Sequence, residues 1–227
     1  MNDLLPLSDG LGTRFARHLT AINDDITLQQ ADVLWQDIAR RYGEPRRAYH
    51  TLAHIKQLFE QFDHIQHYLY EPPIIALALF YHDVIYDPTR ADNELKSAQY
   101  AVDTLSQYIS AAQCQEVYAL IMMTANHQID RVIDGVKYND AAYLLDMDLS
   151  ILGAPWAVYQ QYARSVRQEY AHVSDDNYRD GRTTVLQTLL THPKLYLTNY
   201  YYKRLESQAR DNIKREMNSL LCSQFYK

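Results

Sequence analysis

Hydrophobic positions recur at a helical period along nearly the whole chain. One example is an apolar stripe formed by Leu52, Ile55, Leu58, Phe59 and Phe62, inside a helix predicted from about residue 49 to residue 65. Alternating polar and apolar runs bounded by tight turns, the mark of β-strands, do not occur in the sequence. The pattern therefore predicts an all-α fold.

Capping residues mark where several of these helices begin. Thr27 and Gln30 predict a capping box in front of a helix at 28–42, and Ser110 and Gln113 predict another before a helix that reaches residue 127. The other predicted helices begin at Pro72, run from an Asp92 N-cap to about residue 109, and cover about 140–152, 155–172, 178–190 and 199–220.

These segments add up to roughly nine helices, and no repeat, low-complexity tract or linker separates them. A chain of 227 residues is also within the range of one domain. We therefore expect a single helical bundle over residues 1–227, with a helical core at about 28–172 and C-terminal helices at 178–220 packed on it.

Charge and composition narrow the class of partner. The formal net charge is −6, which gives no general attraction to nucleic acid or to an anionic membrane. The first residues, Met1 to Pro6, lack the basic region and the long apolar core expected of a signal peptide, and no apolar run approaches the roughly 18 residues that a membrane span needs. We expect a cytoplasmic protein with a small-molecule partner, no nucleic-acid polymer and no membrane, and a homodimer stays open.

The strongest chemical signal is His82-Asp83, which follows the apolar run that starts at Pro72 and is predicted to lie on the same helix. A buried carboxylate needs a partner, because desolvating an unpaired charge costs several kcal/mol. His50 and His54 are spaced i and i+4, which places both rings on one face of a helix. Imidazole nitrogens with carboxylate oxygens suit a divalent ion such as Zn, Mn, Fe, Co, Ni or Mg.

Further acidic residues lie in Asp146-Met147-Asp148-Leu149-Ser150, on a later predicted helix. The order of His50, His82-Asp83 and Asp148 resembles the H...HD...D signature of the HD-domain superfamily of metal-dependent phosphohydrolases. Leu79-Phe80-Tyr81-His82-Asp83-Val84 and Asp148-Leu149-Ser150 are similar to the words around its ligands. The stretches 49–55, 81–87, 92–98 and 209–213 resemble a group of bacterial predicted hydrolases of that superfamily.

The resemblance implies an HD-like helical fold in which His50, His82, Asp83 and Asp148 ligate one divalent metal ion. It also implies hydrolysis of a phosphate ester or phosphoanhydride in a small phosphorylated compound, such as a nucleotide, by a metal-activated water. Asp146 is the alternative last ligand. Residues two apart on a helix point about 200° away from each other, so Asp146 and Asp148 are not both expected to face the ion.

Other side chains are assigned supporting roles, each beside a structural alternative. Asp83, Glu94 and His127 are the predicted catalytic residues, although Glu94 and His127 would also stabilise the ends of their helices. His54, Lys96 and Arg182 are predicted to contact the substrate, and a surface ion pair is the alternative for the two cations.

The sequence is also compatible with two other functions. The chain could be a metal-containing binding or sensor module without turnover. It could instead be a di-iron oxygenase, which would need His127 together with Glu94 or Asp92 to complete a second metal site.

Overall fold

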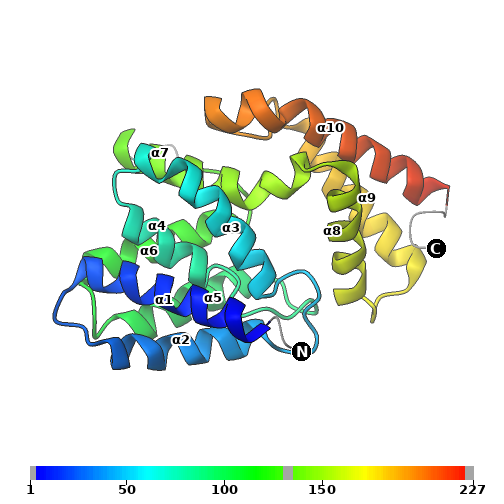
Figure 1. Ribbon diagram of the computed structural model, residues 1–227. Coiled ribbons are helices and arrows are strands. Elements are labelled where there is room, and N and C mark those ends of the chain that lie inside the picture. Colours follow the sequence, from blue (N-terminus) through cyan, green and yellow to red (C-terminus); the bar gives the residue numbers. More distant parts are fainter. Residues whose placement is uncertain (1–3, 130–134, 223–227) are drawn as a thin grey trace. The chain divides into compact units, whose positions relative to one another are not determined.

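The computed structural model describes residues 4–129 and 135–222, and these residues form helices with no strand among them. The all-α prediction is confirmed, with ten α-helices in the described part of the chain against about nine expected. Figure 1 draws them in order: α1 (Leu4–Ile22), α2 (Leu28–Tyr42), α3 (Leu52–Ile65), η1 (Gln66–Tyr68), α4 (Pro72–Tyr81), α5 (Asn93–Leu105), α6 (Ala111–Thr124), α7 (Gly135–Asp148), η2 (Leu149–Gly153), α8 (Trp156–Glu169), α9 (Asp175–Thr191) and α10 (Asn199–Leu221).

The chain divides into two compact units, residues 1–144 and residues 145–227. We call them unit 1 and unit 2. The division falls inside α7, so the last four residues of that helix belong to unit 2. The predicted arrangement of a core at 28–172 with C-terminal helices packed on it stays a prediction.

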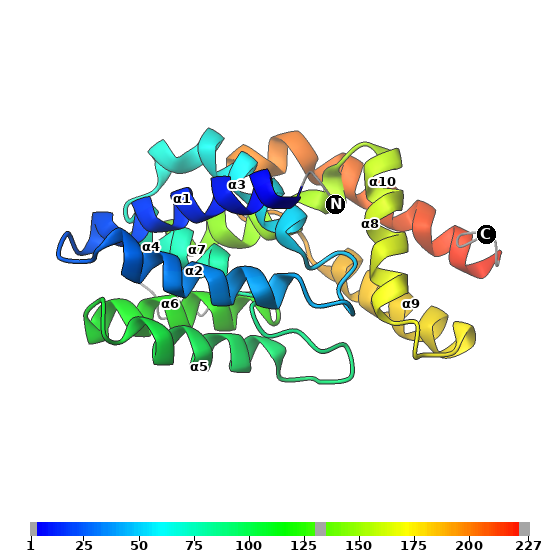
Figure 2. The ribbon, with the colours of Figure 1, turned by 60° about the horizontal axis from the view of Figure 1, so that its bottom comes forward.

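Unit 1 is organised around α4. Every residue from Ile74 to Tyr81 is buried, because this helix is apolar on all sides and has neighbours on all sides. It packs against α1, α3, α5 and α6, and Figure 2 shows α1 beside α2 and α5 beside α6. The chain leaving the end of α4 is therefore held by the packed core of unit 1.

Both predicted capping boxes are present. Thr27 and Gln30 bond each other's backbone N–H groups at the start of α2, and Ser110 and Gln113 do the same at the start of α6. Asp92 stands at the N-cap position of α5 as predicted, but its side chain makes no capping bond. Its carboxylate instead accepts hydrogen bonds from the Arg90 guanidinium, at 2.7 and 2.8 Å.

The sequence pattern did not predict α1, whose Pro6, Gly10 and Gly12 are poor helix formers. Tertiary burial explains why the helix forms. Phe15 is completely buried, with its ring centroid 5.3 Å from that of Phe80 in an edge-to-face contact. Packing on α4 therefore outweighs the weak helix propensity of α1.

Gly12 should not tolerate a side chain, because a Cβ there would lie 2.6 Å from Cδ1 and Nε1 of Trp35. Trp35 is 2% exposed and cannot move aside. We expect Gly12→Ala to lower the free energy of unfolding by about 1 to 3 kcal/mol. Gly10→Ala, two residues earlier in α1 with nothing within 4 Å of its Cβ, should raise it by about 0.5 to 1 kcal/mol. Urea unfolding measures both, and equal effects would contradict the packing.

The buried side chain of His18 is expected to make the stability of the protein depend on pH in the acidic range. Its ring is 6% exposed, stacks on Phe59, and has no hydrogen-bond partner for Nε2 within the described residues. Burial lowers the pKa of His18 from 6.5 to about 4. Between these pH values the unfolded chain binds more protons than the folded chain, so the free energy of unfolding falls as the pH falls.

We therefore expect protonation of His18 to lower the free energy of unfolding of the wild type by up to about 3 kcal/mol as the pH drops from about 6.5 to 4. His18→Leu should remove that part of the loss, whereas His64→Leu, at an exposed position of α3, should leave it in place. Urea unfolding across this pH range gives the result. Parallel curves for the wild type and His18→Leu would show that His18 does not titrate in this way.

Unit 2 consists of the end of α7, η2 and the helices α8 to α10, with α10 in contact with η2, α8 and α9. The Asn212 amide on α10 donates hydrogen bonds to the carbonyls of Leu152 and Ala154, both at 2.8 Å. Glu206, one turn and a half earlier, accepts hydrogen bonds from the backbone N–H groups of Leu195 and Tyr196. Side chains of α10 thus supply hydrogen-bond partners for backbone N–H and carbonyl groups in the segments around them.

None of the helices in the described ranges combines the length and the apolar character that crossing a membrane requires.

Candidate metal centre

Three imidazole side chains of unit 1 converge on one carboxylate oxygen, Oδ2 of Asp83. Nε2 of His82 lies 3.0 Å from it, Nε2 of His50 lies 3.8 Å away and Nε2 of His54 lies 3.9 Å away. The Nε2 atoms of His54 and His82 are 3.3 Å apart. Three imidazoles and a carboxylate therefore gather at one point within this unit.

The first two histidines reach this point from a helix start. The predicted helix began at residue 49, but α3 begins at Leu52, with Thr51 as its N-cap. His50 thus lies just before the helix and His54 in its first turn, so they are not one turn apart on a single helix as expected. Both rings still point toward Asp83, because the chain turns into α3 between them.

The second pair reaches the point from a helix end. The prediction placed His82-Asp83 on a helix, but α4 ends at Tyr81 and His82 is its C-cap. The backbone N–H of His82 still donates to the carbonyl of Ala78 at 2.9 Å, after which the chain turns. The buried helix therefore sets the position of His82, and the turn brings the Asp83 carboxylate back beside it.

The tautomer of His82 follows from its second nitrogen. Nδ1 lies 2.9 Å from the carbonyl oxygen of Leu79, and a carbonyl oxygen only accepts hydrogen bonds, so Nδ1 carries the hydrogen. In the neutral ring Nε2 then presents a lone pair toward His54 and Asp83. Metal-binding histidines are held in this way, with one nitrogen bonded to a carbonyl and the other left for the ion.

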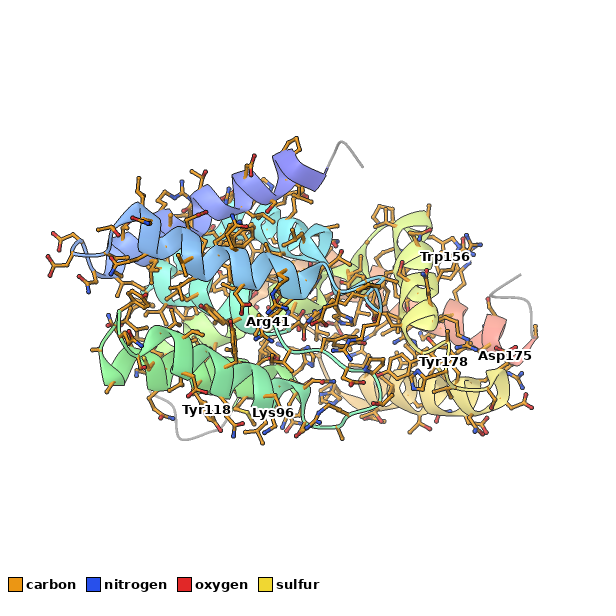
Figure 3. All side chains as sticks on the ribbon, turned by 90° about the horizontal axis from the view of Figure 1, so that it is seen from below. Arg41, Lys96, Tyr118, Trp156, Asp175 and Tyr178 are labelled. Atoms are coloured by element: carbon orange, nitrogen blue, oxygen red, sulfur yellow. The ribbon has the colours of Figure 1, made fainter. Side chains whose placement is uncertain are left out.

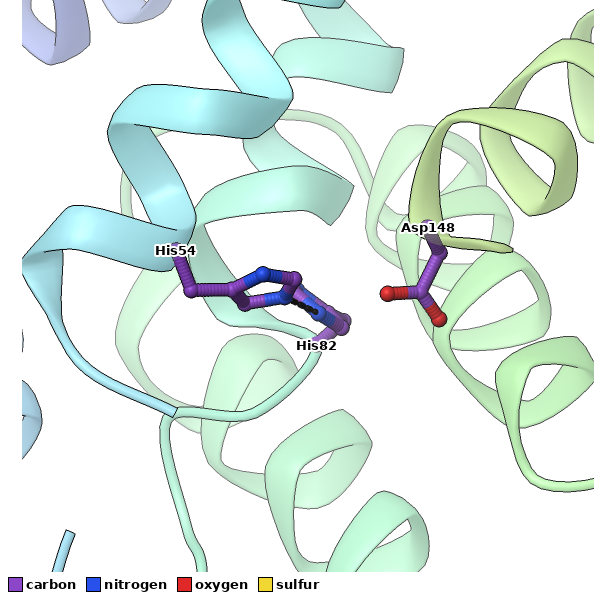
Figure 4. A group of neighbouring side chains, drawn as sticks. All are labelled: His54, His82 and Asp148. Atoms are coloured by element: carbon purple, nitrogen blue, oxygen red, sulfur yellow. Dashed lines mark hydrogen bonds between the residues drawn. The ribbon is translucent and has the colours of Figure 1, made fainter. Parts of the chain in front are cut away.

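Asp148 is the last residue of α7, a helix that begins in unit 1 and is anchored there by Asp140. The Asp140 carboxylate accepts hydrogen bonds from the backbone N–H groups of Tyr70, at 3.0 Å, and Glu71, at 2.8 Å. Figure 4 draws His54, His82 and Asp148, three residues that could hold a metal ion.

Asp146 is the alternative last ligand, but its carboxylate accepts hydrogen bonds from other residues of unit 2. One carboxylate oxygen accepts the backbone N–H of Leu197 at 2.7 Å, and the other accepts the N–H and the hydroxyl of Thr198 at 2.8 and 2.7 Å. Burial raises the pKa of Asp146 to about 6, although these hydrogen bonds favour its charged form. Asp146 thus fastens the start of α10, and the opposed directions expected of Asp146 and Asp148 agree with this.

Arg47 was not identified from the sequence, yet it joins the two segments that carry the site. Its side chain is completely buried. One terminal nitrogen donates to the carbonyl of His50 at 3.1 Å and to that of Asp83 at 2.7 Å, and the other donates to the carbonyl of Val84 at 2.9 Å. Its position three residues before His50 was the signal available in the sequence.

Two further residues that sequence reasoning missed hold the backbone just after Asp83. The Ser97 hydroxyl accepts from the N–H of Ile85 and donates to its carbonyl, at 3.1 and 3.2 Å. The Asn93 amide does the same for the N–H and carbonyl of Asp87, at 3.0 and 2.9 Å. Asn93 and Ser97 are spaced i and i+4 on α5, a pattern that could have indicated a shared task.

The other predicted functional residues have these surroundings. Lys96 on α5, labelled in Figure 3, donates to the Gln99 side chain at 3.1 Å. Arg182, in unit 2, is held by Glu216 at 2.8 Å. His127 has φ of 52°, a left-handed conformation just beyond the end of α6. The catalytic roles of Glu94 and His127, and the substrate contacts of Lys96 and Arg182, stay predictions.

Comparisons with protein-family models, with curated proteins and with solved structures found no match to this chain. The likeness to the HD-domain superfamily therefore stays a prediction based on the residues quoted for it, and the chemistry of the site depends on the donor groups described above.

Proposed function

We propose that this chain is a metal-dependent phosphohydrolase that acts on a small phosphorylated compound. The observation that supports this most is the gathering of three imidazole Nε2 atoms within 3.0 to 3.9 Å of Asp83 Oδ2. Such a cluster of lone pairs and negative charge is unfavourable alone and becomes favourable around a divalent cation. It coincides with the residues through which the sequence resembles HD phosphohydrolases.

The donor set fits one ion of the borderline or hard class. We propose His54, His82 and Asp148 as ligands, with Asp83 beside them. His50 was the predicted ligand and His54 the predicted substrate contact, so the proposal adds His54 to the ligands and keeps His50 at the edge of the site. Nitrogen and oxygen donors without a thiolate match Zn, Mn, Fe, Co or Ni better than a soft metal.

A bound divalent ion would supply Lewis acidity, activating a water and offsetting the charge of a phosphate oxygen. The exposure of the side chains indicates from which side the substrate arrives. His54 and His82 are each 2% exposed, whereas His50 is 19% and Asp83 14% exposed. We propose that phosphate and water approach over His50 and Asp83, and that Asp83 accepts a hydrogen bond from the attacking water.

Cationic groups for the phosphate are a second requirement. Arg182 is bound by Glu216, and Arg210, another arginine of unit 2, is bound by Glu206 at 2.7 Å. Lys96 donates to the neutral amide of Gln99, and the carboxylate that its charge acts on, that of Asp92, is already bound by Arg90. We therefore favour Lys96 over the two arginines as a contact for substrate.

The di-iron alternative has less support from the geometry. In residues 4–129 and 135–222, the group able to hold a metal ion does not include Asp92, Glu94 or His127. Asp92 is bound by Arg90 instead. A metal-containing sensor without turnover uses the same ligands, so it is an outcome of the experiment below.

The test combines metal analysis with an activity screen. We expect the purified chain, stripped with a chelator and reloaded with each candidate ion, to hydrolyse at least one compound in a set of phosphomonoesters, phosphodiesters, nucleoside triphosphates and pyrophosphates. The Asp83→Asn variant should keep its helical circular dichroism and lose the activity. Metal binding without turnover on any of these compounds would refute the hydrolase and leave the sensor. Absence of metal binding would refute both.

A further inference from the structure

Arg47 occupies an unusual place for a cation. Its side chain has no exposed surface, and its nearest carboxylate in the described part of the chain is that of Glu44, 3.7 Å from Nε. The guanidinium faces three backbone carbonyls instead. Burying a charged group costs free energy. The role of a buried arginine that binds backbone carbonyls should therefore follow from the segments that it joins.

The three carbonyls belong to the two segments that carry the candidate metal centre. The carbonyl of His50 lies in the loop before α3, and the carbonyls of Asp83 and Val84 lie in the turn after α4. One planar guanidinium thus joins segments more than thirty residues apart in the sequence. A lysine could not do this, because its single nitrogen cannot reach three acceptors in fixed directions.

Aromatic rings complete the setting of Arg47. Its guanidinium carbon lies 4.9 Å from the ring centroid of Tyr42 and 5.5 Å from that of Tyr86. The Tyr86 ring in turn lies 4.1 Å from the imidazole of His50. Arg47 therefore supports His50 twice, through the backbone carbonyl and through the ring that packs on the imidazole.

We propose that Arg47 is a positioning residue for metal binding, which fixes the distance between His50 and Asp83 without touching the ion. This inference rests on the proposed function. Groups that orient metal ligands from outside the coordination shell typically change metal affinity by about 10- to 100-fold when they are replaced. Arg47 matches that description because each bond it donates goes to the backbone of a proposed site residue or its neighbour.

The test is the affinity for Co²⁺ of the wild type, Arg47→Lys and Arg46→Lys, measured by competition with a chelator and by the visible absorption of the bound ion. Arg46 is the matched control, since it is the adjacent arginine, 48% exposed, and it binds Glu44 and Asp87 at the surface. We expect Arg47→Lys to bind Co²⁺ about 10- to 100-fold more weakly with a changed absorption spectrum, and Arg46→Lys to match the wild type.

The outcomes separate this inference from the proposed function. Equal affinity and spectrum for Arg47→Lys and the wild type would overturn the role of Arg47 alone, and so would equal losses in both variants. A wild type that binds no Co²⁺ would overturn both proposals. If Arg47→Lys does not fold, Arg47→Ala with added millimolar guanidinium replaces it. Recovery of Co²⁺ binding with guanidinium, but not with ammonium, would support the role, and no recovery would overturn it.

Discussion

His82→Ala is expected to lower the affinity for a divalent ion by more than about 100-fold while the helices stay folded. The estimate is a lower bound, because replacing residues that only orient a ligand already costs about 10- to 100-fold. The Nε2 atom of His82 lies within 3.3 Å of His54 and within 3.0 Å of Asp83, so it is central to the cluster. Elemental analysis after dialysis, with circular dichroism for the fold, gives the result.

The control for this variant is His64→Ala, which removes an imidazole from an exposed position of α3 and should leave the metal content unchanged. His54→Ala and His50→Ala distinguish the two candidate first ligands. Because His54 is buried beside His82 and His50 lies at the edge, we expect His54→Ala to lose more metal. Full metal occupancy in His82→Ala would show that the ligand assignment is wrong.

The largest expected loss of stability is in unit 2, at the ion pair of Arg182 and Glu216. Glu216 has no exposed side-chain surface and Arg182 is 9% exposed. The guanidinium binds both carboxylate oxygens, at 2.8 and 3.0 Å, and the Tyr159 hydroxyl donates to the same carboxylate. Arg182→Met would leave a buried carboxylate without its cation, which costs about 3 to 5 kcal/mol of unfolding free energy.

The double variant Arg182→Met/Glu216→Leu removes both charges and should recover most of that loss, because two apolar side chains of similar size can replace a buried ion pair. Urea unfolding measures the three proteins. If the predicted substrate contact of Arg182 is instead its main role, Arg182→Met will keep the wild-type stability and lose only hydrolysis. The stability of Arg182→Met thus decides between the two roles.

The elements predicted most accurately from the sequence are those determined locally. The capping boxes of α2 and α6 involve residues only three positions apart, so the sequence predicted both Thr27 with Gln30 and Ser110 with Gln113. Helix α1 was not predicted because its glycines and proline disfavour a helix, and only the burial of Phe15 on α4 compensates. A packing contact between residues so far apart in the sequence leaves no pattern within the α1 segment itself.

Some residues of the candidate site could likewise be identified from the sequence, and others were not. His82-Asp83 at the end of an apolar run could be identified because burial makes the pair chemically unusual. Arg47, Asn93 and Ser97 were not identified, since their partners are backbone groups that every residue has and their spacing in the sequence is a weak signal. Helix geometry indicated that Asp146 and Asp148 would not both face one ion, and the hydrogen bonds that Asp146 accepts from Leu197 and Thr198 favour Asp148 as the ligand.

X-ray absorption spectroscopy of the chain loaded with one divalent ion tests most directly whether these histidines share a cation. We predict a shell of nitrogen and oxygen ligands with the multiple-scattering signature of at least two imidazoles, weakened in His54→Ala and in His82→Ala. An ion surrounded by oxygen alone, or a spectrum identical in the wild type and both variants, would contradict it.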